Sequence, residues 1–209
     1  MTPEATIDAP DAHQDILHPG SRALFRYWEA VRGERTAPSR ADIDLKKIKE
    51  YVPWLFVLDR HALKQSYSWR LAGTKLCQLW RKNLTGSDFF ADWSRFERES
   101  AVRLLDNVAG AHQPIVLRFR LHSSLGHSIG AELLGLPAIS RDGQTTQIIG
   151  SIMPFRDIDN LGYDRLTSLE LSGARVIWTE PIPAAPAPFA GAHARPFSSF
   201  QVIDGGLSR

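Results

Sequence analysis

The chain has little cysteine and no long apolar run. Its 209 residues include one cysteine, Cys77, which has no partner for an internal disulfide and therefore favours a reducing compartment. The apolar runs fall far short of the ~20 residues that a membrane-spanning helix needs. The acidic, proline-bearing first residues lack the basic and apolar segments of a signal peptide. We therefore expect a cytoplasmic protein without a membrane anchor.

Catalytic motifs and strong net charge are scarce as well. The sequence has no His-Glu-x-x-His pair, no dinucleotide-binding glycine fingerprint and no phosphate-binding loop, so we expect a protein that is not an enzyme. The formal net charge of +2 is too small to indicate a nucleic-acid protein. Residues 22–49 nevertheless carry eight basic against four acidic residues. Solvated helix faces explain this excess, and nucleic-acid binding by basic N-terminal helices is an alternative.

What the chain does have is a periodicity that changes along its length. Residues 1–20 carry three prolines and little periodicity, and we expect a flexible leader there. Residues 179–209 are rich in proline and alanine, which is typical of a disordered tail. Between them we expect one domain over residues 21–178. In it, N-terminal helices in residues 21–53 precede a core in residues 54–158.

The spacing of apolar residues predicts the elements of this domain. Two amphipathic helices are expected over residues 21–32 and 38–53, the second with a capping box of Ser39 and Asp42. Residues 163–178 are compatible with either a helix or a strand. The core is expected to hold two strands, a short helix, a longer helix and three strands. In that order they are residues 54–59, 66–71, 75–80, 94–110, 115–121, 127–139 and 145–155.

Six sequence segments, in order, resemble a known family. They are RYWEAVRGERTAPSRADID (26–44), FVLD (56–59), WRLAGTKLCQLW (69–80), LTGSDF (84–89), ELLGLPAI (132–139) and IIGSIMPF (148–155). With the element order, they resemble a PAS-like family common in alphaproteobacteria. The resemblance implies an α+β fold with a five-stranded antiparallel sheet in the order 2-1-5-4-3, helices on one face and N-terminal helices before it. It also implies a bacterial sensory protein that acts through protein-protein contacts, without an attached output domain.

The positions of the residues that would bind PAS cofactors disfavour both haem and a flavin adduct. In light-sensing PAS domains the reactive cysteine directly follows an asparagine that should fall near Asn83, and this sequence has Leu84 in that place. Cys77 lies on the preceding helix. A haem sensor would need an axial histidine on the long helix, and the nearest candidate, His112, lies beyond Gly110. We expect no cofactor, and binding of an unidentified small ligand is an alternative.

Aromatic residues are frequent in the segments that would lie between the sheet and the helices. Trp69, Trp80 and Phe119 are candidates for lining a ligand pocket, and a filled core is the alternative. Glu132 is a fourth candidate, because it stands within an apolar run. An inward-facing carboxylate there would need an arginine such as Arg118 or Arg70, whereas an outward-facing one would not.

Two histidines raise further possibilities. His122 and His127 flank an expected hairpin turn and could meet as a metal pair, but two ligands are too few for a structural zinc site, so we expect no metal. A small enzyme or a carrier of hydrophobic ligands is the alternative function. Its polar dyad would be Glu132 with His122 or His127.

The helix over residues 21–32 has more aromatic surface than one helix is expected to bury. Phe25, Tyr27, Trp28 and Val31 are therefore the candidates for a homodimer interface. A signalling protein is the expected partner, and neither nucleic acid nor a membrane is favoured.

Overall fold

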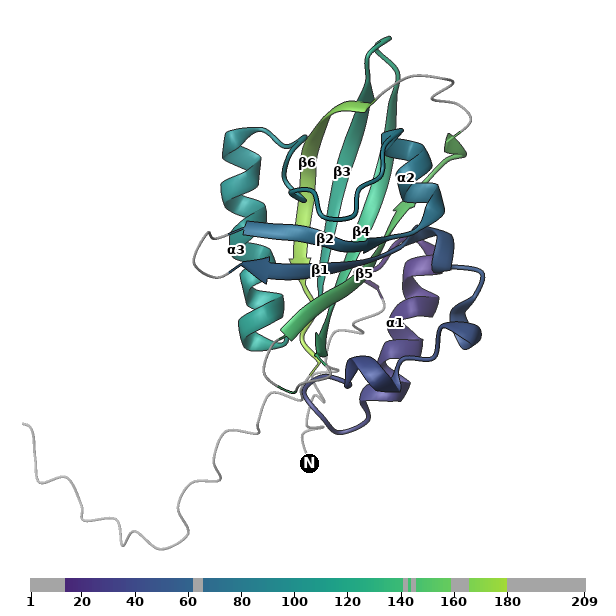
Figure 1. Cartoon of the computed structure of the whole chain (residues 1–209), viewed down its shortest axis with the longest axis vertical. Helices are drawn as coiled ribbons and strands as arrows, with labels where there is room; N and C mark the ends of the chain where they lie inside the picture. The colour runs from purple at the N-terminus through teal and green to yellow at the C-terminus, as the bar shows by residue number, and fades with distance from the viewer. Residues whose placement is uncertain (1–13, 62–65, 141–142, 144–145, 159–165, 180–209) are drawn as a thin grey trace, which may run out of the picture. The chain divides into compact units, whose positions relative to one another are not determined.

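The computed structural model describes residues 14–61, 66–140, 143, 146–158 and 166–179. In this part of the chain, six strands form one sheet in the order β2-β1-β5-β4-β3-β6 (Figure 1). The expected order 2-1-5-4-3 is present within it. The expected number of five strands is wrong, because residues 166–176 add a sixth strand beside β3. No helix in the described ranges is long and apolar enough to cross a membrane.

All neighbouring strands of the sheet are antiparallel. In Figure 1, β1 and β2 run across the view whereas β3, β4 and β6 run almost vertically, so the sheet is strongly twisted. The strands are β1 (Leu55–His61), β2 (Ser66–Ala72), β3 (Ile115–Ser123), β4 (Ser128–Ile139), β5 (Thr146–Pro154) and β6 (Leu166–Val176).

The first helix, α1 (Pro19–Arg32), begins earlier than the sequence predicts. His18 is its N-cap, Pro19 occupies the first turn and Gly33, with φ of 58°, ends it. Ile16 is fully buried. The folded part therefore begins before residue 21, and the expected leader over residues 1–20 extends too far.

The predicted second helix over residues 38–53 is wrong. The structure has three short 3-10 turns instead, η1 (Arg40–Asp42), η2 (Leu45–Ile48) and η3 (Val52–Trp54). The capping box of Ser39 and Asp42 is confirmed, but it starts only the first turn. Ile43 then has an extended backbone, and the carboxylate of Asp44 accepts a hydrogen bond from Lys46 N to start the second turn.

The other two helices agree with the prediction. They are α2 (Thr74–Trp80) and α3 (Arg95–Ala111). Ser94 caps α3 and accepts a hydrogen bond from Glu97 N. Glu97 also accepts a hydrogen bond from Leu171 N at 2.7 Å, which connects the start of α3 to β6.

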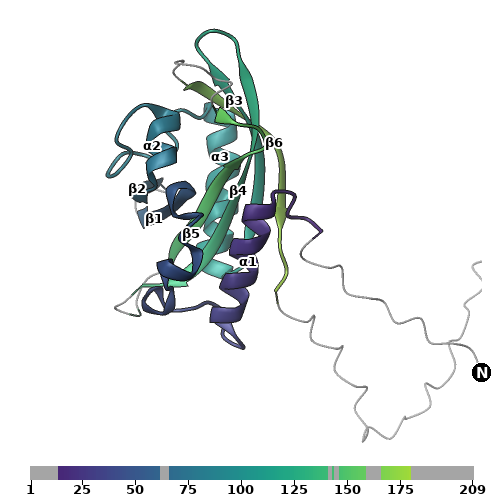
Figure 2. The same ribbon diagram turned by 90° about the vertical axis from the view of Figure 1, so that its right-hand side faces the viewer.

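Alternation along the strands divides the buried residues between the two faces of the sheet. On β4, Ala131 and Leu133 pack with residues of α2 and α3, whereas Leu134 and Leu136 pack with residues of α1. The two faces thus have separate cores with different helices over each. In Figure 2, α2 lies beside β1 and β2, on the opposite side of the view from β6. The expected tail over residues 179–209 lies outside the described residues except for Thr179.

Candidate functional site

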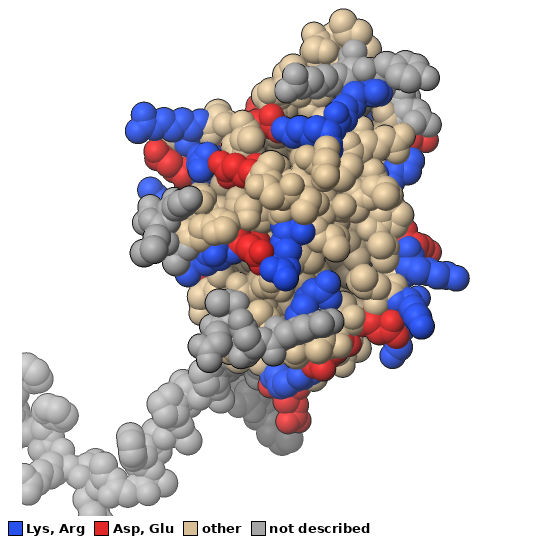
Figure 3. Space-filling view, viewed as in Figure 1, with Lys and Arg blue, Asp and Glu red and all other residues tan. Residues whose placement is uncertain are grey.

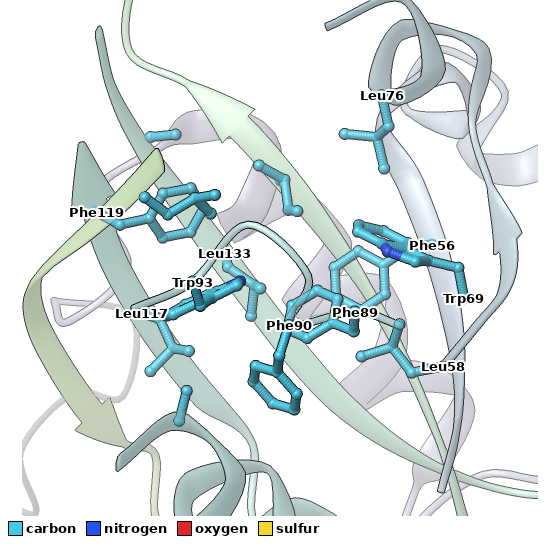
Figure 4. Packing of buried hydrophobic residues seen from close by; sticks show 14 of the residues in the cluster. Phe56, Leu58, Trp69, Leu76, Phe89, Phe90, Trp93, Leu117, Phe119 and Leu133 are labelled. Carbon is cyan, nitrogen blue, oxygen red and sulfur yellow. The ribbon is translucent and has the colours of Figure 1, made fainter. Parts of the chain in front are cut away.

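A cluster of eight buried rings fills the space between the sheet and the helices α2 and α3, and we refer to it as the aromatic interior. Figure 4 shows part of it and labels Phe56, Trp69, Phe89, Phe90, Trp93 and Phe119. Strands β1 and β2 supply three of the rings, α2 and β3 one each, and residues 89–93 the other three. Every member is at most 9% exposed. The members are Phe56, Tyr67, Trp69, Trp80, Phe89, Phe90, Trp93 and Phe119.

The rings form a continuous series of contacts across the sheet. Trp69 of β2 lies 5.0 Å from Phe89, centroid to centroid, and Phe89 lies 5.9 Å from Trp93. Trp93 lies 5.9 Å from Phe119 of β3. Phe56 meets Trp69 edge-on at 5.8 Å. These are the spacings at which aromatic pairs attract each other, so segment 89–93 connects the rings of β2 to the ring of β3.

Polar groups border the aromatic interior, and two carboxylates there each hold one ring. Asp92 accepts hydrogen bonds from Trp80 Nε1 and Lys82 Nζ, both at 3.1 Å. Asp106 of α3 accepts hydrogen bonds from the Tyr67 hydroxyl and from the guanidinium of Arg60, both at 2.8 Å. Each carboxylate therefore fixes a ring on its inner side and a cation on its outer side.

Burial, together with the hydrogen bond to Asp106, raises the pKa of Tyr67 well above its usual range. Tyr67 therefore remains a neutral hydrogen-bond donor at the edge of the aromatic interior.

A third carboxylate, Asp88, holds the segment that crosses the interior. It accepts hydrogen bonds from Phe90 N at 3.1 Å and from Arg98 of α3 at 2.9 Å. The guanidinium of Arg98 also lies 5.5 Å from the centre of the Phe90 ring, which is a cation-π distance. A surface hollow of about 320 Å³ opens beside this pair. Its lining residues are His61, Ser66, Tyr67, Ser68, Asp88 and Arg98.

The structure brings together three of the four ligand-pocket candidates. Trp69, Trp80 and Phe119 are all buried in the aromatic interior. Glu132 is also buried, but its carboxylate accepts hydrogen bonds from the backbone of residues 17 and 18, next to α1. Because that is the opposite face of the sheet, Glu132 cannot line a pocket with the other three, and its predicted place there is wrong.

Of the two arginines considered as partners for Glu132, Arg118 lies beside it, with Nε 3.5 Å from Glu132 Oε2. Arg70 instead pairs with Asp59 at 3.1 Å. Strand periodicity could have identified Arg118, because the β3–β4 hairpin places residues 118 and 132 directly opposite each other.

Two of the four candidates for a dimer interface are inside the protomer. Phe25 is 0% and Trp28 1% exposed, and Trp28 Nε1 donates a hydrogen bond to Pro137 O at 2.8 Å. Their assignment to a dimer interface is wrong, because the sheet buries the aromatic face of α1. Tyr27 and Val31 are half-buried, and Tyr27 exchanges hydrogen bonds with the backbone of Asp44.

The two candidates for cofactor binding, Cys77 and His112, lie on different helices. Cys77 on α2 directs its thiol to the carbonyl of Ala72 at 3.9 Å. His112 caps the end of α3, and its Nε2 lies 3.0 Å from Thr146 Oγ1. Among the residues that the structure describes, no three His, Cys, Asp and Glu side chains are grouped to hold a metal ion.

The dyad of Glu132 and His122 in the enzyme alternative is not assembled. His122 Nε2 lies 3.1 Å from Glu170 Oε2 on β6, not beside Glu132. Residues 126–130 read Gly-His-Ser-Ile-Gly, a pattern that the sequence reasoning missed and that matches a nucleophile elbow. An elbow needs a strand-turn-helix, and here Ser128 begins β4 in a hairpin. The match therefore lacks the backbone geometry that would activate the serine.

The basic residues of segment 22–49 are partly engaged within the chain. Arg35 pairs with Asp42 at 2.7 Å, and Arg32 lies 5.3 Å from the centre of the Trp28 ring. On the face shown in Figure 3, Lys and Arg side chains are interspersed with Asp and Glu over the surface. That face therefore presents no continuous basic surface.

A comparison with known protein families agrees with this arrangement. The family model of the PAS domain matches residues 16–153 of the chain. A search of curated proteins finds no match. The matched range begins at the buried Ile16 and ends within β5, so β6 lies outside it.

Proposed function

The chain belongs to the PAS domain family, and from that premise we propose that it is a sensor that binds a small, flat, apolar ligand in the aromatic interior. The signal leaves through protein contacts, without catalysis. PAS domains have sensory and regulatory roles, and the ligand, its site and the partner are the steps that we add.

The observation that supports this proposal is the position of segment 89–93. Phe89, Phe90 and Trp93 lie between the rings of β2 and the ring of β3, in the place that a flat ligand would need. Ligand sites are lined mostly by apolar and aromatic side chains with a few fixed polar groups. Trp80 Nε1 and the Tyr67 hydroxyl are two such groups, and each has a carboxylate partner at the edge.

The ion pair between this segment and α3 is partly exposed to solvent. Arg98 and Asp88 hold it from α3, and their side chains are 37% and 38% exposed. An ion pair with this much exposure contributes only about 0–1 kcal/mol. We propose that the ligand enters from the hollow beside this pair and displaces the ring of Phe90.

Native mass spectrometry of the protein purified from its own host tests the proposal. We expect an additional mass of a small molecule that is released on denaturation, with an absorbance spectrum recorded in parallel. In the emptied protein, 8-anilinonaphthalene-1-sulfonate should bind with one site per chain. The variant Phe90→Ala should bind this probe more tightly, because it removes the ring that occupies the site.

The matched control is Phe96→Ala, since Phe96 lies on α3 but is 80% exposed. It should bind the probe as the wild type does. A protein without bound mass, whose probe affinity is the same in both variants and the wild type, would contradict the ligand site.

The oligomeric state is part of the same proposal. We propose a homodimer, and light scattering measures its mass. Of the four residues expected at the interface, only Tyr27 and Val31 have exposed surface to contribute. A monomer over the full concentration range would exclude this part and leave the ligand site unaffected.

A further inference from the structure

A buried carboxylate fixes the chain where α1 begins. Glu132 on β4 is 0% exposed. Its Oε2 accepts a hydrogen bond from Leu17 N at 2.8 Å, and its Oε1 accepts one from His18 N at 2.9 Å. These bonds span more than 110 residues of sequence. They hold the residues before α1 against the sheet, although Leu17 itself is 51% exposed.

Arg118 on β3 completes the contact from the other side. It lies opposite Glu132 in the sheet, and its Nε lies 3.5 Å from Glu132 Oε2. The same guanidinium donates a hydrogen bond to the carbonyl of Asp15. We call residues 15–18 the N-terminal arm. The ion pair of Glu132 and Arg118 binds two backbone N–H groups of this arm, those of Leu17 and His18, and one backbone carbonyl, that of Asp15.

The arm and the first turn of α1 are a single unit. His18 is the N-cap, and its Nδ1 accepts a hydrogen bond from Gly20 N at 3.1 Å. Arg22 donates a hydrogen bond back to Ile16 O at 3.4 Å. Release of the arm would therefore also remove the support of the α1 N-terminus.

The ion pair is directly behind the aromatic interior. Side chains alternate along a strand, so Phe119 and Leu133 point into the interior while their neighbours Arg118 and Glu132 point to the arm. A shift of β3 or β4 that makes room for a ligand on one face would change the geometry of the ion pair on the other. Two hydrogen bonds of 2.8 and 2.9 Å to a fully buried carboxylate tolerate little displacement.

We propose that Glu132 and Arg118 form a latch that holds the N-terminal arm, and that the state of the aromatic interior controls this latch. The coupling rests on the proposed function, whereas the latch itself does not. When the latch opens, the arm and the first turn of α1 leave the sheet together while Phe25 and Trp28 stay buried, and this change in residues 15–22 is the output that a partner reads.

Amide hydrogen exchange of the full chain without ligand tests the latch. In Glu132→Gln, an amide group replaces one of the two acceptor oxygens. Exchange at Leu17 and His18 should become about 10- to 100-fold faster, the range for losing a hydrogen bond to a charged group. Exchange in β5 should stay unchanged. The matched control is Glu170→Gln on β6, whose carboxylate is 63% exposed and which should leave the arm unchanged.

A second variant covers the case in which Glu132→Gln does not fold. Arg118→Gln removes the bond to Asp15 and keeps both acceptors of Glu132, and Arg118 is 25% exposed. It should also accelerate exchange in the arm more than in β5. If neither variant accelerates it, or if exchange rises equally in the arm and in β5, there is no latch and Glu132 belongs only to the core.

The coupling has its own test. Leu133→Ala leaves a gap in the interior beside the latch, and Leu76→Ala leaves one on α2; both residues are 0% exposed. Exchange in the arm should increase more in Leu133→Ala. Equal effects would overturn the coupling while leaving the latch intact. These exchange experiments use no ligand. If the proposed ligand site does not exist, the evidence will therefore come from mass spectrometry and dye binding and not from the exchange rates.

Discussion

The charged side chains on the two faces of the sheet differ in their exposure to solvent. On the face of the aromatic interior, each cation and carboxylate at the edge keeps contact with solvent; Lys82 and Asp92 are 36% and 22% exposed. On the face of α1, Glu132 has no exposed surface and Arg118 is 25% exposed. An exposed pair can open at little cost, whereas a buried carboxylate that loses its partners is strongly destabilising. The first face is therefore suited to opening and the second to holding.

The largest effect that we predict is at Trp28, under α1. Trp28→Ala removes a ring that is 1% exposed and leaves Pro137 O without its donor. We expect a loss of about 3–5 kcal/mol in the free energy of unfolding, measured by denaturation in urea. The matched control is Trp178→Ala, which removes a ring that is 71% exposed and should cost about 0.5 kcal/mol or less.

The same pair of variants decides what the aromatic face of α1 does. If Trp28→Ala keeps the unfolding midpoint of the wild type and instead halves the mass in light scattering, Trp28 is an interface residue. In that case the contrast between the two faces fails, since α1 would not be held as part of the core.

A substitution at the edge of the aromatic interior should lower the free energy of unfolding less than Trp28→Ala does. Asp92→Ala leaves the Trp80 indole N–H without its acceptor, and Trp80 is 5% exposed. We expect a loss of about 1–3 kcal/mol in the free energy of unfolding, the cost of an unpaired buried donor. Removal of an exposed carboxylate, Glu99→Ala, should cost only about 0.5 kcal/mol, because the pair of Glu99 with Arg95 lies on the surface of α3. Equal losses in the two variants would show that the edge does not fix the ring.

The sequence predicted the elements of the aromatic interior but not the elements around α1. Strand alternation and turn residues are local, so the five core strands and α3 could be assigned from the sequence. Segment 38–53 was assigned wrongly because Leu45, Ile48 and Val52 have helical spacing in a chain that actually folds into separate 3-10 turns. The apolar pattern of residues 163–178 does not distinguish a helix from a strand. The reason is that Leu166 and Leu169 are the only buried residues of β6, so no regular alternation marks it as a strand.

The role of Glu132 could be predicted only in part. Its even position on β4 places it with Leu134 and Leu136, and not with Leu133. That alternation is visible in the sequence and separates Glu132 from the aromatic candidates. Its two backbone partners are not visible, because backbone N–H groups at residues 17 and 18 leave no trace in the type of side chain found there.

The smallest effect that we predict is the pH response of His18, at the edge of the latch. Burial lowers the pKa of His18 below 6.5, while Glu132 acts to raise the pKa and Arg22 to lower it. Because the folded state binds the proton less readily than the unfolded state, stability is complete above pH 6.5 and declines as the pH falls through the lowered pKa. Protonation of His18 Nδ1 would also turn this acceptor into a donor, so the hydrogen bond from Gly20 N would be lost. The decline should stay within the ~0.5–2 kcal/mol of an N-cap.

His18→Asn isolates this effect, because asparagine also caps helices but does not titrate. Urea denaturation at pH 7.5 and pH 5.5 should show a smaller loss of stability in the variant than in the wild type. The difference should appear together with weaker protection of the Leu17 amide, relative to its intrinsic exchange rate at each pH, in the wild type at the lower pH, since His18 and the arm share the same support. If stability falls by the same amount in both proteins, the charge of His18 has no effect on the latch. Glu132 and Arg118 alone would then hold the arm.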